Sequence, residues 1–141
     1  MPMEKFITSF PTDRKGLVLT ELNSFPGSNG TQARASATAQ DLVFAICRNG
    51  YKVGGIRLLP DNYGAAEIGF WLEEGQTGKG YATLAVRAMV KYGDYDALYA
   101  TVPEENEKAA AVLTRSNFVE FSNKAGQILF CEGRFLERTG H

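Results

Sequence analysis

The segment EEGQTGKGYA, residues 73–82, decides the fold class of this 141-residue chain. It places three glycines and a lysine directly before a segment with apolar or small residues at helical spacing, namely Tyr81, Leu84, Ala85, Ala88, Met89 and Tyr92. This pattern predicts an amphipathic helix of about four turns. The strand-like segments AEIGFWLEE (66–74) and ALYATVP (97–103) lie on either side. A strand, a helix and a second strand form a βαβ crossover, which predicts a parallel strand pair within the sheet.

Further strand-like segments surround this crossover. Asn49-Gly50, between LVFAICR (42–48) and YKVGGIRLL (51–59), is typical of a two-residue hairpin turn because both residues tolerate positive φ. We also expect a strand at 15–22, a loop or poorly anchored helix at 23–40, a helix at 105–116 and two strands within 118–135 around a four-residue turn at 123–126. The sequence therefore predicts an α+β fold, with a mixed twisted sheet of about 6–7 strands, in a single domain spanning residues 1–141.

Charge and cysteine content restrict the partners and the compartment. Fifteen basic and sixteen acidic side chains give a net charge of -1, so we expect no binding to nucleic acid or to an anionic membrane. Cys47 and Cys131 lie in apolar segments without CxxC spacing, which indicates buried thiols and a cytoplasmic protein. No secretory signal and no run of ~18 apolar residues is found. His141 is the single histidine and the last residue, so we expect no metal site and no histidine-based triad.

The glycines of residues 73–82 indicate an anion site at the start of the helix. The first amide N–H groups of a helix have no partner within it, and the helix dipole places partial positive charge there. We expect a phosphate or pyrophosphate to bind the amides of residues 78–82, with Lys79 as a further contact, unless the glycines serve only a tight turn. The spacing excludes a Walker loop, because Gly80 follows Lys79, and it also excludes the GxGxxG dinucleotide motif.

Two longer segments resemble a known family. AEIGFWLEEGQTGKGYATLAVRAMVKYG (66–93) and LYATVPEENEKAAAVLTRSNFVEF (98–121) resemble the GNAT acyltransferase superfamily, particularly its ribosomal-protein alanine N-acetyltransferase (RimJ/RimL-like) branch. The family's [Q/R]xxGx[G/A] loop, which wraps the pyrophosphate of coenzyme A, aligns with Thr77, Gly80 and Ala82. Thr77 departs from the usual glutamine or arginine, although Gln76 directly precedes it.

The resemblance implies that the sheet opens at one central strand pair. In this family the strand before the loop is splayed from its neighbour, and its exposed backbone, here Phe70 to Leu72, pairs with the pantetheine arm of coenzyme A. The Leu72 amide would polarise the thioester carbonyl. Glu67 would be the general base, unless it is a solvated strand-edge glutamate, and Asn106 would lie near the cofactor arm, unless it only caps a helix. The implied ligands of coenzyme A are Phe70, Trp71, Leu72, Thr77, Gly78, Lys79, Gly80, Tyr81, Ala82 and Asn106.

The activity implied by the resemblance is acetyl-CoA-dependent N-acetylation, in which a primary amine attacks the acetyl group directly. The amine would belong to a protein N-terminus or to a small molecule. Relatives often place a serine or a tyrosine as the general acid where this chain has Ala109 and Leu113, so the usual proton donor is absent. Tyr63, Tyr81 and Tyr99 are the candidate substitutes.

Two other functions stay open at this point. A catalytically weak acyl-CoA-binding module with a regulatory role would explain the departures at Thr77, Ala109 and Leu113 together. Alternatively, the first strand and the short segment after it would form a homodimer surface, and the coenzyme A site would be vestigial. In relatives, two helices between the first two strands form a wall of the acceptor site. Only about twenty mostly polar residues separate positions 22 and 43 here, so the resemblance implies an open acceptor groove and a peptide-like acceptor.

Overall fold

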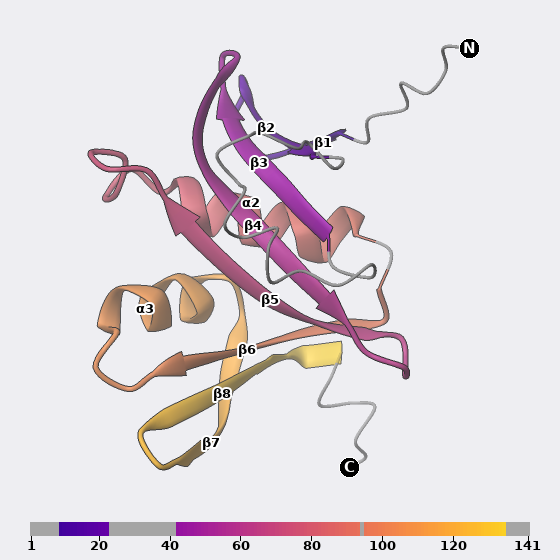
Figure 1. Ribbon diagram of the computed structural model, residues 1–141, viewed down its shortest axis with the longest axis vertical. Helices are drawn as coiled ribbons and strands as arrows, with labels where there is room; N and C mark the ends of the chain where they lie inside the picture. The colour runs from indigo at the N-terminus through magenta and orange to yellow at the C-terminus, as the bar shows by residue number, and fades with distance from the viewer. Residues whose placement is uncertain (1–8, 23–41, 94, 135–141) are drawn as a thin grey trace.

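The computed structural model describes residues 9–22, 42–93 and 95–134. In these ranges eight strands form one mixed sheet in the order β1-β2-β3-β4-β5-β6-β8-β7; α2 crosses behind the sheet and α3 lies beside β6 (Figure 1). The elements are β1 (Ser9–Pro11), β2 (Leu17–Glu21), β3 (Leu42–Arg48), β4 (Tyr51–Pro60), β5 (Ala65–Leu72), α2 (Tyr81–Tyr92), β6 (Ala97–Pro103), α3 (Glu107–Arg115), β7 (Phe118–Lys124) and β8 (Gln127–Glu132). Neither helix is long and apolar enough to cross a membrane, as judged over the described ranges.

The predicted α+β fold and its βαβ crossover are confirmed. β5, α2 and β6 follow one another, and β5 and β6 pair in parallel, whereas the other neighbouring strands pair antiparallel. The sheet has more strands than the six or seven predicted, because the three-residue β1 pairs with β2. So short a segment carries no periodicity that sequence reasoning could detect. The predicted loop at 23–40 lies outside the described residues.

The turns are partly as predicted. Asn49 and Gly50 have φ values of 50° and 89° and close the β3–β4 hairpin, which confirms that prediction. The predicted four-residue turn at 123–126 is wrong. Pairing continues to Lys124 and Gln127, so only Ala125 and Gly126, with φ values of 55° and 80°, form the turn.

Helix α2 is shorter than predicted. It has 12 residues, about three helical turns rather than four, and ends before Gly93.

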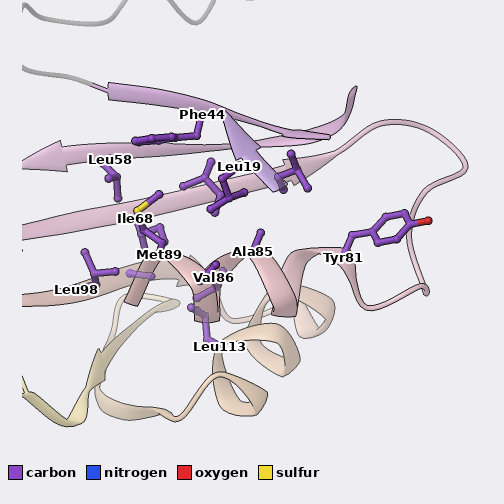
Figure 2. Packing of buried hydrophobic residues seen from close by; sticks show 14 of the residues in the cluster. Leu19, Phe44, Leu58, Ile68, Tyr81, Ala85, Val86, Met89, Leu98 and Leu113 are labelled. Atoms are coloured by element: carbon purple, nitrogen blue, oxygen red, sulfur yellow. The ribbon is translucent and has the colours of Figure 1, made fainter. Parts of the chain in front are cut away.

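The core lies between the sheet and α2. In Figure 2 side chains of the strands, among them Leu58, Ile68 and Leu98, point toward α2, and Leu113 of α3 lies at the far side of that helix. The largest fully buried side chains are Leu17, Leu19, Ile46, Ile56, Leu58, Met89, Leu98, Leu113, Val86 and Cys131. Side chains alternate between the two faces of a strand. Because Ala66 and Ile68 of β5 belong to this core, Glu67, Gly69 and Trp71 face away from α2.

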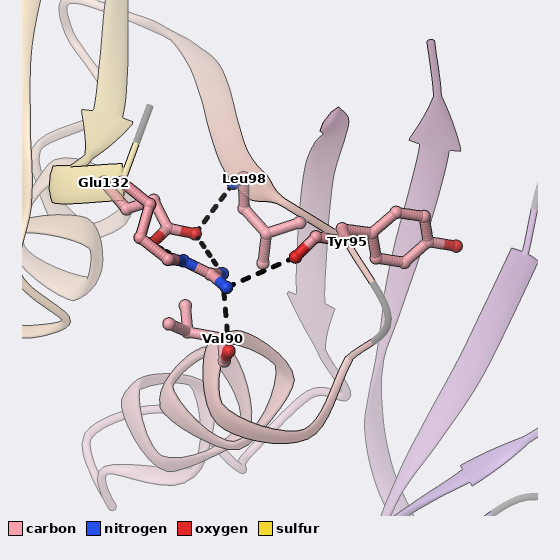
Figure 3. Close-up of polar contacts among 5 residues, drawn as sticks. Val90, Tyr95, Leu98 and Glu132 are labelled. Carbon is pink, nitrogen blue, oxygen red and sulfur yellow. Dashed lines mark hydrogen bonds and ion pairs between the residues drawn. The ribbon is translucent and has the colours of Figure 1, made fainter. Parts of the chain in front are cut away.

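A buried carboxylate ties β6 and β8 to the end of α2 (Figure 3). Glu132 is 4 % exposed, and its Oε2 accepts a hydrogen bond from the Leu98 N–H at 2.8 Å. Arg134 donates to both carboxylate oxygens at 2.6 and 2.7 Å, and also to the carbonyls of Tyr95 and Val90. The hydrogen bond to Glu132 raises the pKa of Arg134. This contact fixes the start of β6 against α2.

Replacing Glu132 tests this contact. Glu132→Ala leaves the buried Leu98 N–H without its acceptor, so we expect the free energy of unfolding to fall by roughly 1–3 kcal/mol in urea titrations. Glu132→Gln keeps an acceptor oxygen and should lose less. The exposed Glu120→Ala is the matched control and should be close to neutral. Equal stability of Glu132→Ala and Glu120→Ala would contradict the role of this carboxylate.

Candidate active site

β5 and β6 separate part-way along their length. Their parallel pairing covers only three residue pairs, from Ala65↔Ala97 to Glu67↔Tyr99, although β5 continues to Leu72. β6 meanwhile stays paired with β8 as far as Pro103. Among the described residues, no strand covers this edge of β5 beyond Glu67. The predicted splay of a central strand pair is therefore confirmed.

The exposed edge of β5 presents backbone donors to the gap. Gly54 and Leu72 are opposite one another in the antiparallel β4–β5 pair, and the next donor along, the Glu73 N–H, bonds to the Val53 carbonyl at 2.8 Å. Backbone groups of successive strand residues point to opposite sides. Because the Glu73 donor points to β4, the Leu72 N–H points away from β4 and into the gap. The Phe70 N–H has the same direction.

The helix start beside this edge is uncapped. Gly80 is the N-cap of α2 with φ 82°, no side chain of the described residues caps the helix there, and the first turn holds no acidic residue. The first helical hydrogen bond runs from the Leu84 N–H to the Gly80 carbonyl at 3.1 Å, so the N–H groups of residues 81–83 have no acceptor within the helix. Gly78 and Gly80 both have positive φ, and a Cβ on either would meet no described atom within 4 Å. A ligand can approach these donors closely.

A cleft of about 950 Å³ joins the strand edge, the glycine loop and α3. Its lining contains every predicted coenzyme A ligand except Lys79: Phe70, Trp71, Leu72, Thr77, Gly78, Gly80, Tyr81, Ala82 and Asn106. The Lys79 ammonium instead donates to the Gln76 side chain at 3.5 Å. Sequence reasoning missed three cations of the lining, Arg14, Lys108 and Arg115. The carboxylate of Glu107 also lies there, so the cleft has an excess of positive charge.

Two positions of α3, Asn106 and Leu113, bear on the site predicted from the sequence. The Asn106 Oδ1 accepts a hydrogen bond from the Ala109 N–H at 3.1 Å, so Asn106 does cap α3, and its exposed side chain also borders the cleft. Leu113 is fully buried in the core. A proton donor at that position would therefore lie inside the core rather than in the cleft.

Two arginines hold the glycine loop from the side of β2 and β3. The Arg48 guanidinium donates to the Tyr81 hydroxyl at 2.6 Å, and the guanidinium carbons of Arg48 and Arg14 lie 5.8 and 5.7 Å from the centre of the Tyr81 ring. Arg14 also donates to the Lys79 carbonyl at 3.3 Å. The Tyr81 hydroxyl is thus engaged with a cation. Nothing in the local sequence pattern indicates either arginine, because each meets the loop only through the tertiary fold.

Glu67 lies at the point where the strands part. It pairs with Tyr99 in the last rung of the β5–β6 ladder, and both side chains are half-buried on the face opposite α2. Burial raises the pKa of Tyr99, and the charges of Asp61 and Glu67 raise it further. Tyr99 therefore keeps its proton at neutral pH.

Neither cysteine is placed to act as a nucleophile. Burial raises the pKa of Cys131 to about 11 and also raises the pKa of Cys47. Both thiols are free, and both stay protonated at neutral pH. In the described ranges no three side chains of histidine, cysteine, aspartate or glutamate gather closely enough to hold a metal ion.

Comparison with known proteins identifies the family. The sequence profile described as acetyltransferase (GNAT) domain matches residues 19–119. The chain belongs to the GNAT acetyltransferase family. The resemblance to this family predicted from residues 66–121 is thereby confirmed. No curated protein sequence matches this GNAT chain.

Several solved GNAT structures share the fold. An apo crystal form of RimL, the ribosomal L7/L12 alpha-N-protein acetyltransferase, matches with a TM-score of 0.66 and 14% identity over 93% of this chain and 96% of that one. RimL in complex with coenzyme A gives 0.59 and 18%, over 66% of this chain and 62% of that one, so less than two thirds of that chain is matched. A chimera of the spermidine N-acetyltransferase SpeG from Vibrio cholerae and hSSAT gives 0.62 and 18%, over 76% and 73%. At these identities the likeness establishes the fold alone.

Blocking the glycine loop tests the anion site of this GNAT chain. Gly80→Glu fills the open space at the uncapped helix start and adds a negative charge, so calorimetry should detect no binding of coenzyme A. Gly75→Glu is the matched control, because Gly75 has the same left-handed backbone, with φ 83°, but does not line the cleft. It carries the same charge and the same backbone strain. Unchanged affinity in Gly80→Glu, or equal loss in both variants, would rule out the loop as the anion site.

Proposed function

We propose that the chain is an acetyl-CoA-dependent N-acetyltransferase that acts on a primary amine. The observation that carries the proposal is the continuity between the freed edge of β5 and the uncapped start of α2 within one cleft. A diphosphate suits the amides and partial positive charge of a helix start. The amide-rich arm of coenzyme A suits an unpaired strand edge, where it can pair as an added strand does.

The residues of the cleft divide into those that hold the diphosphate and those that orient the thioester. We assign the diphosphate to the amides of the loop 78–80 and of the first helical residues 81–83, with Arg14 supplying positive charge at the lining. Bound acetyl-CoA supplies the acetyl group as an activated thioester. The Leu72 N–H, which points into the gap, donates to the thioester carbonyl oxygen as negative charge grows there. Loss of such a donor costs roughly 3–4 kcal/mol of barrier in other enzymes.

Glu67 is the residue to which we assign removal of the proton. An amine attacks only as its neutral form, so the carboxylate accepts a proton from the acceptor, directly or through a water. Its place at the parting of the strands, on the face opposite α2, supports this role. We assign no general acid. A thiolate has a pKa of about 8.5 and departs without protonation more readily than an alkoxide.

An acyl-CoA-binding module with little transferase activity is the second candidate function. The alanine at position 109 favours it, because this residue lines the cleft and offers no proton donor there. For the transferase, which is the first candidate, the acceptor would be a protein N-terminus or a small-molecule amine.

Two measurements separate these candidates. Native mass spectrometry of the purified protein, with calorimetry using coenzyme A, measures binding. A panel of amines with acetyl-CoA, followed by thiol release, measures transfer. Binding with thiol release for at least one amine is the expected result. Binding without transfer would favour the regulatory module, and absence of binding would contradict both candidates.

Replacing Glu67 tests the assigned base. We expect Glu67→Gln to lower kcat roughly 100-fold at about pH 6 and much less at about pH 9, because more of the amine is already neutral there. The affinity for coenzyme A should not change, since Glu67 does not line the cleft. Glu74→Gln, an exposed glutamate outside the cleft lining, is the matched control. A pH profile identical to that of the parent would remove Glu67 from the mechanism.

A further inference from the structure

The face of β5 opposite α2 carries three side-chain positions with different properties. Glu67, Gly69 and Trp71 alternate along the strand and share this face, whereas Ile68, on the other face, belongs to the core. We call these three residues the acceptor strip. Successive members lie about 7 Å apart along the strand. The strip lies next to the backbone edge to which the thioester is assigned, but on the face turned away from α2.

The indole of Trp71 is held flat against the neighbouring strand. Gly55 of β4 is opposite Trp71, and a Cβ on Gly55 would lie 2.2 Å from Cζ2, 2.4 Å from Cη2 and 2.8 Å from Cε2 of the indole. The ring can occupy this position only because residue 55 has no side chain. Trp71 is nevertheless 38% exposed. The strand pair therefore presents a flat apolar surface in a fixed orientation.

Between Trp71 and Glu67, no side chain of the described residues fills the position above Gly69. Gly69 is exposed, and a Cβ built on it would meet no described atom within 4 Å. Its backbone φ is outside the left-handed region, so a side chain there would cause no backbone strain. The strip thus consists of a carboxylate, a position that no described side chain fills and an aromatic surface, in that order.

We propose that Trp71 determines acceptor specificity and selects a primary amine that carries an aromatic group a few bonds from its nitrogen. The inference rests on the proposed transferase function. Trp71 directly precedes Leu72, so a group in contact with the indole is close to the nitrogen that attacks the thioester. Stacking of two aromatic rings is favourable beyond the area it buries. Glu67 attracts the positive charge of the incoming amine before it loses its proton.

A polyamine carries no aromatic group to stack on the indole, so spermidine serves as a charged, non-aromatic comparison. An arylalkylamine and a peptide with an aromatic first residue share the required chemistry, and the tests below distinguish them.

Tryptophan fluorescence measures contact with the strip directly, because Trp71 is the only tryptophan in the chain. The protein with bound coenzyme A is titrated with phenethylamine, with the dipeptide amide Phe-Gly-NH2, with butylamine and with spermidine. Saturable changes in emission for one or both aromatic amines, at concentrations at least about tenfold below those for butylamine, are expected. The aromatic amine that saturates the change at the lower concentration shows whether the acceptor is an arylalkylamine or a peptide with an aromatic first residue. A spermidine response stronger than either aromatic response, or no aromatic response, would overturn the inference.

Three variants extend the test to turnover. Trp71→Ala removes the aromatic surface, Gly55→Ala displaces the indole, and Gly69→Leu fills the open position. Each should raise KM for aromatic amines about tenfold relative to KM for butylamine, while the circular dichroism spectrum stays unchanged. Trp71→Phe should recover part of the loss. Tyr51→Ala, which removes an aromatic ring that is 77% exposed in the β3–β4 hairpin, is the control.

The outcomes separate this inference from the proposed function. Equal changes in KM for aromatic and aliphatic amines, or no change in any variant, would overturn the role of Trp71 even if transfer occurs. If the parent protein does not bind coenzyme A, the proposed transferase function is wrong. In that case the fluorescence titration, carried out without coenzyme A, still decides whether the acceptor strip binds aromatic amines.

Discussion

After Glu67 and Tyr99, β6 follows β8, and no strand of the described residues then covers the edge of β5 that faces away from β4. A backbone donor that loses its partner must face water or a ligand, because burying it unpaired costs free energy. The donors of Phe70 and Leu72 therefore require an opening in the sheet. The uncapped start of α2 adds a second set of donors at the end of the same opening. The proposed binding of coenzyme A depends on these two sets of donors lying next to each other.

The opening is held by contacts on both sides. On one side, β6 is paired with β8, and Glu132 with Arg134 fixes the start of β6 against the end of α2 (Figure 3). On the other side, Tyr81 and its contacts with Arg14 and Arg48 fix the glycine loop. A site whose donors are already oriented loses less entropy when a ligand binds. The hydrogen bonds away from the cleft thus contribute to binding inside it.

The sequence predicted those turns and helix ends that depend on the backbone preferences of one or two neighbouring residues. Asn49-Gly50 specifies its turn through backbone preference, and the glycines at 78 and 80 specify the start of α2 for the same reason. The cleft lining was largely predictable because one continuous segment, residues 70–84, supplies more than half of it and Asn106 marks the start of α3, which supplies most of the rest. Arg14, Arg48 and Gly55 were not predictable, because their roles depend on strands that meet only in the folded sheet. The two-residue turn at Ala125 was missed because an alanine at positive φ has no local signature.

Amide hydrogen exchange measured by NMR, with and without coenzyme A, tests the central claim most directly. The account predicts that the ligand slows exchange of the Leu72, Ala82 and Thr83 amides, whose donors face the cleft. The amides of Gly69 and Trp71, which point toward β4, should exchange at the same rate in both states. Slowed exchange at another surface, or no change at Leu72 and residues 81–83 while the ligand is bound, would contradict the account.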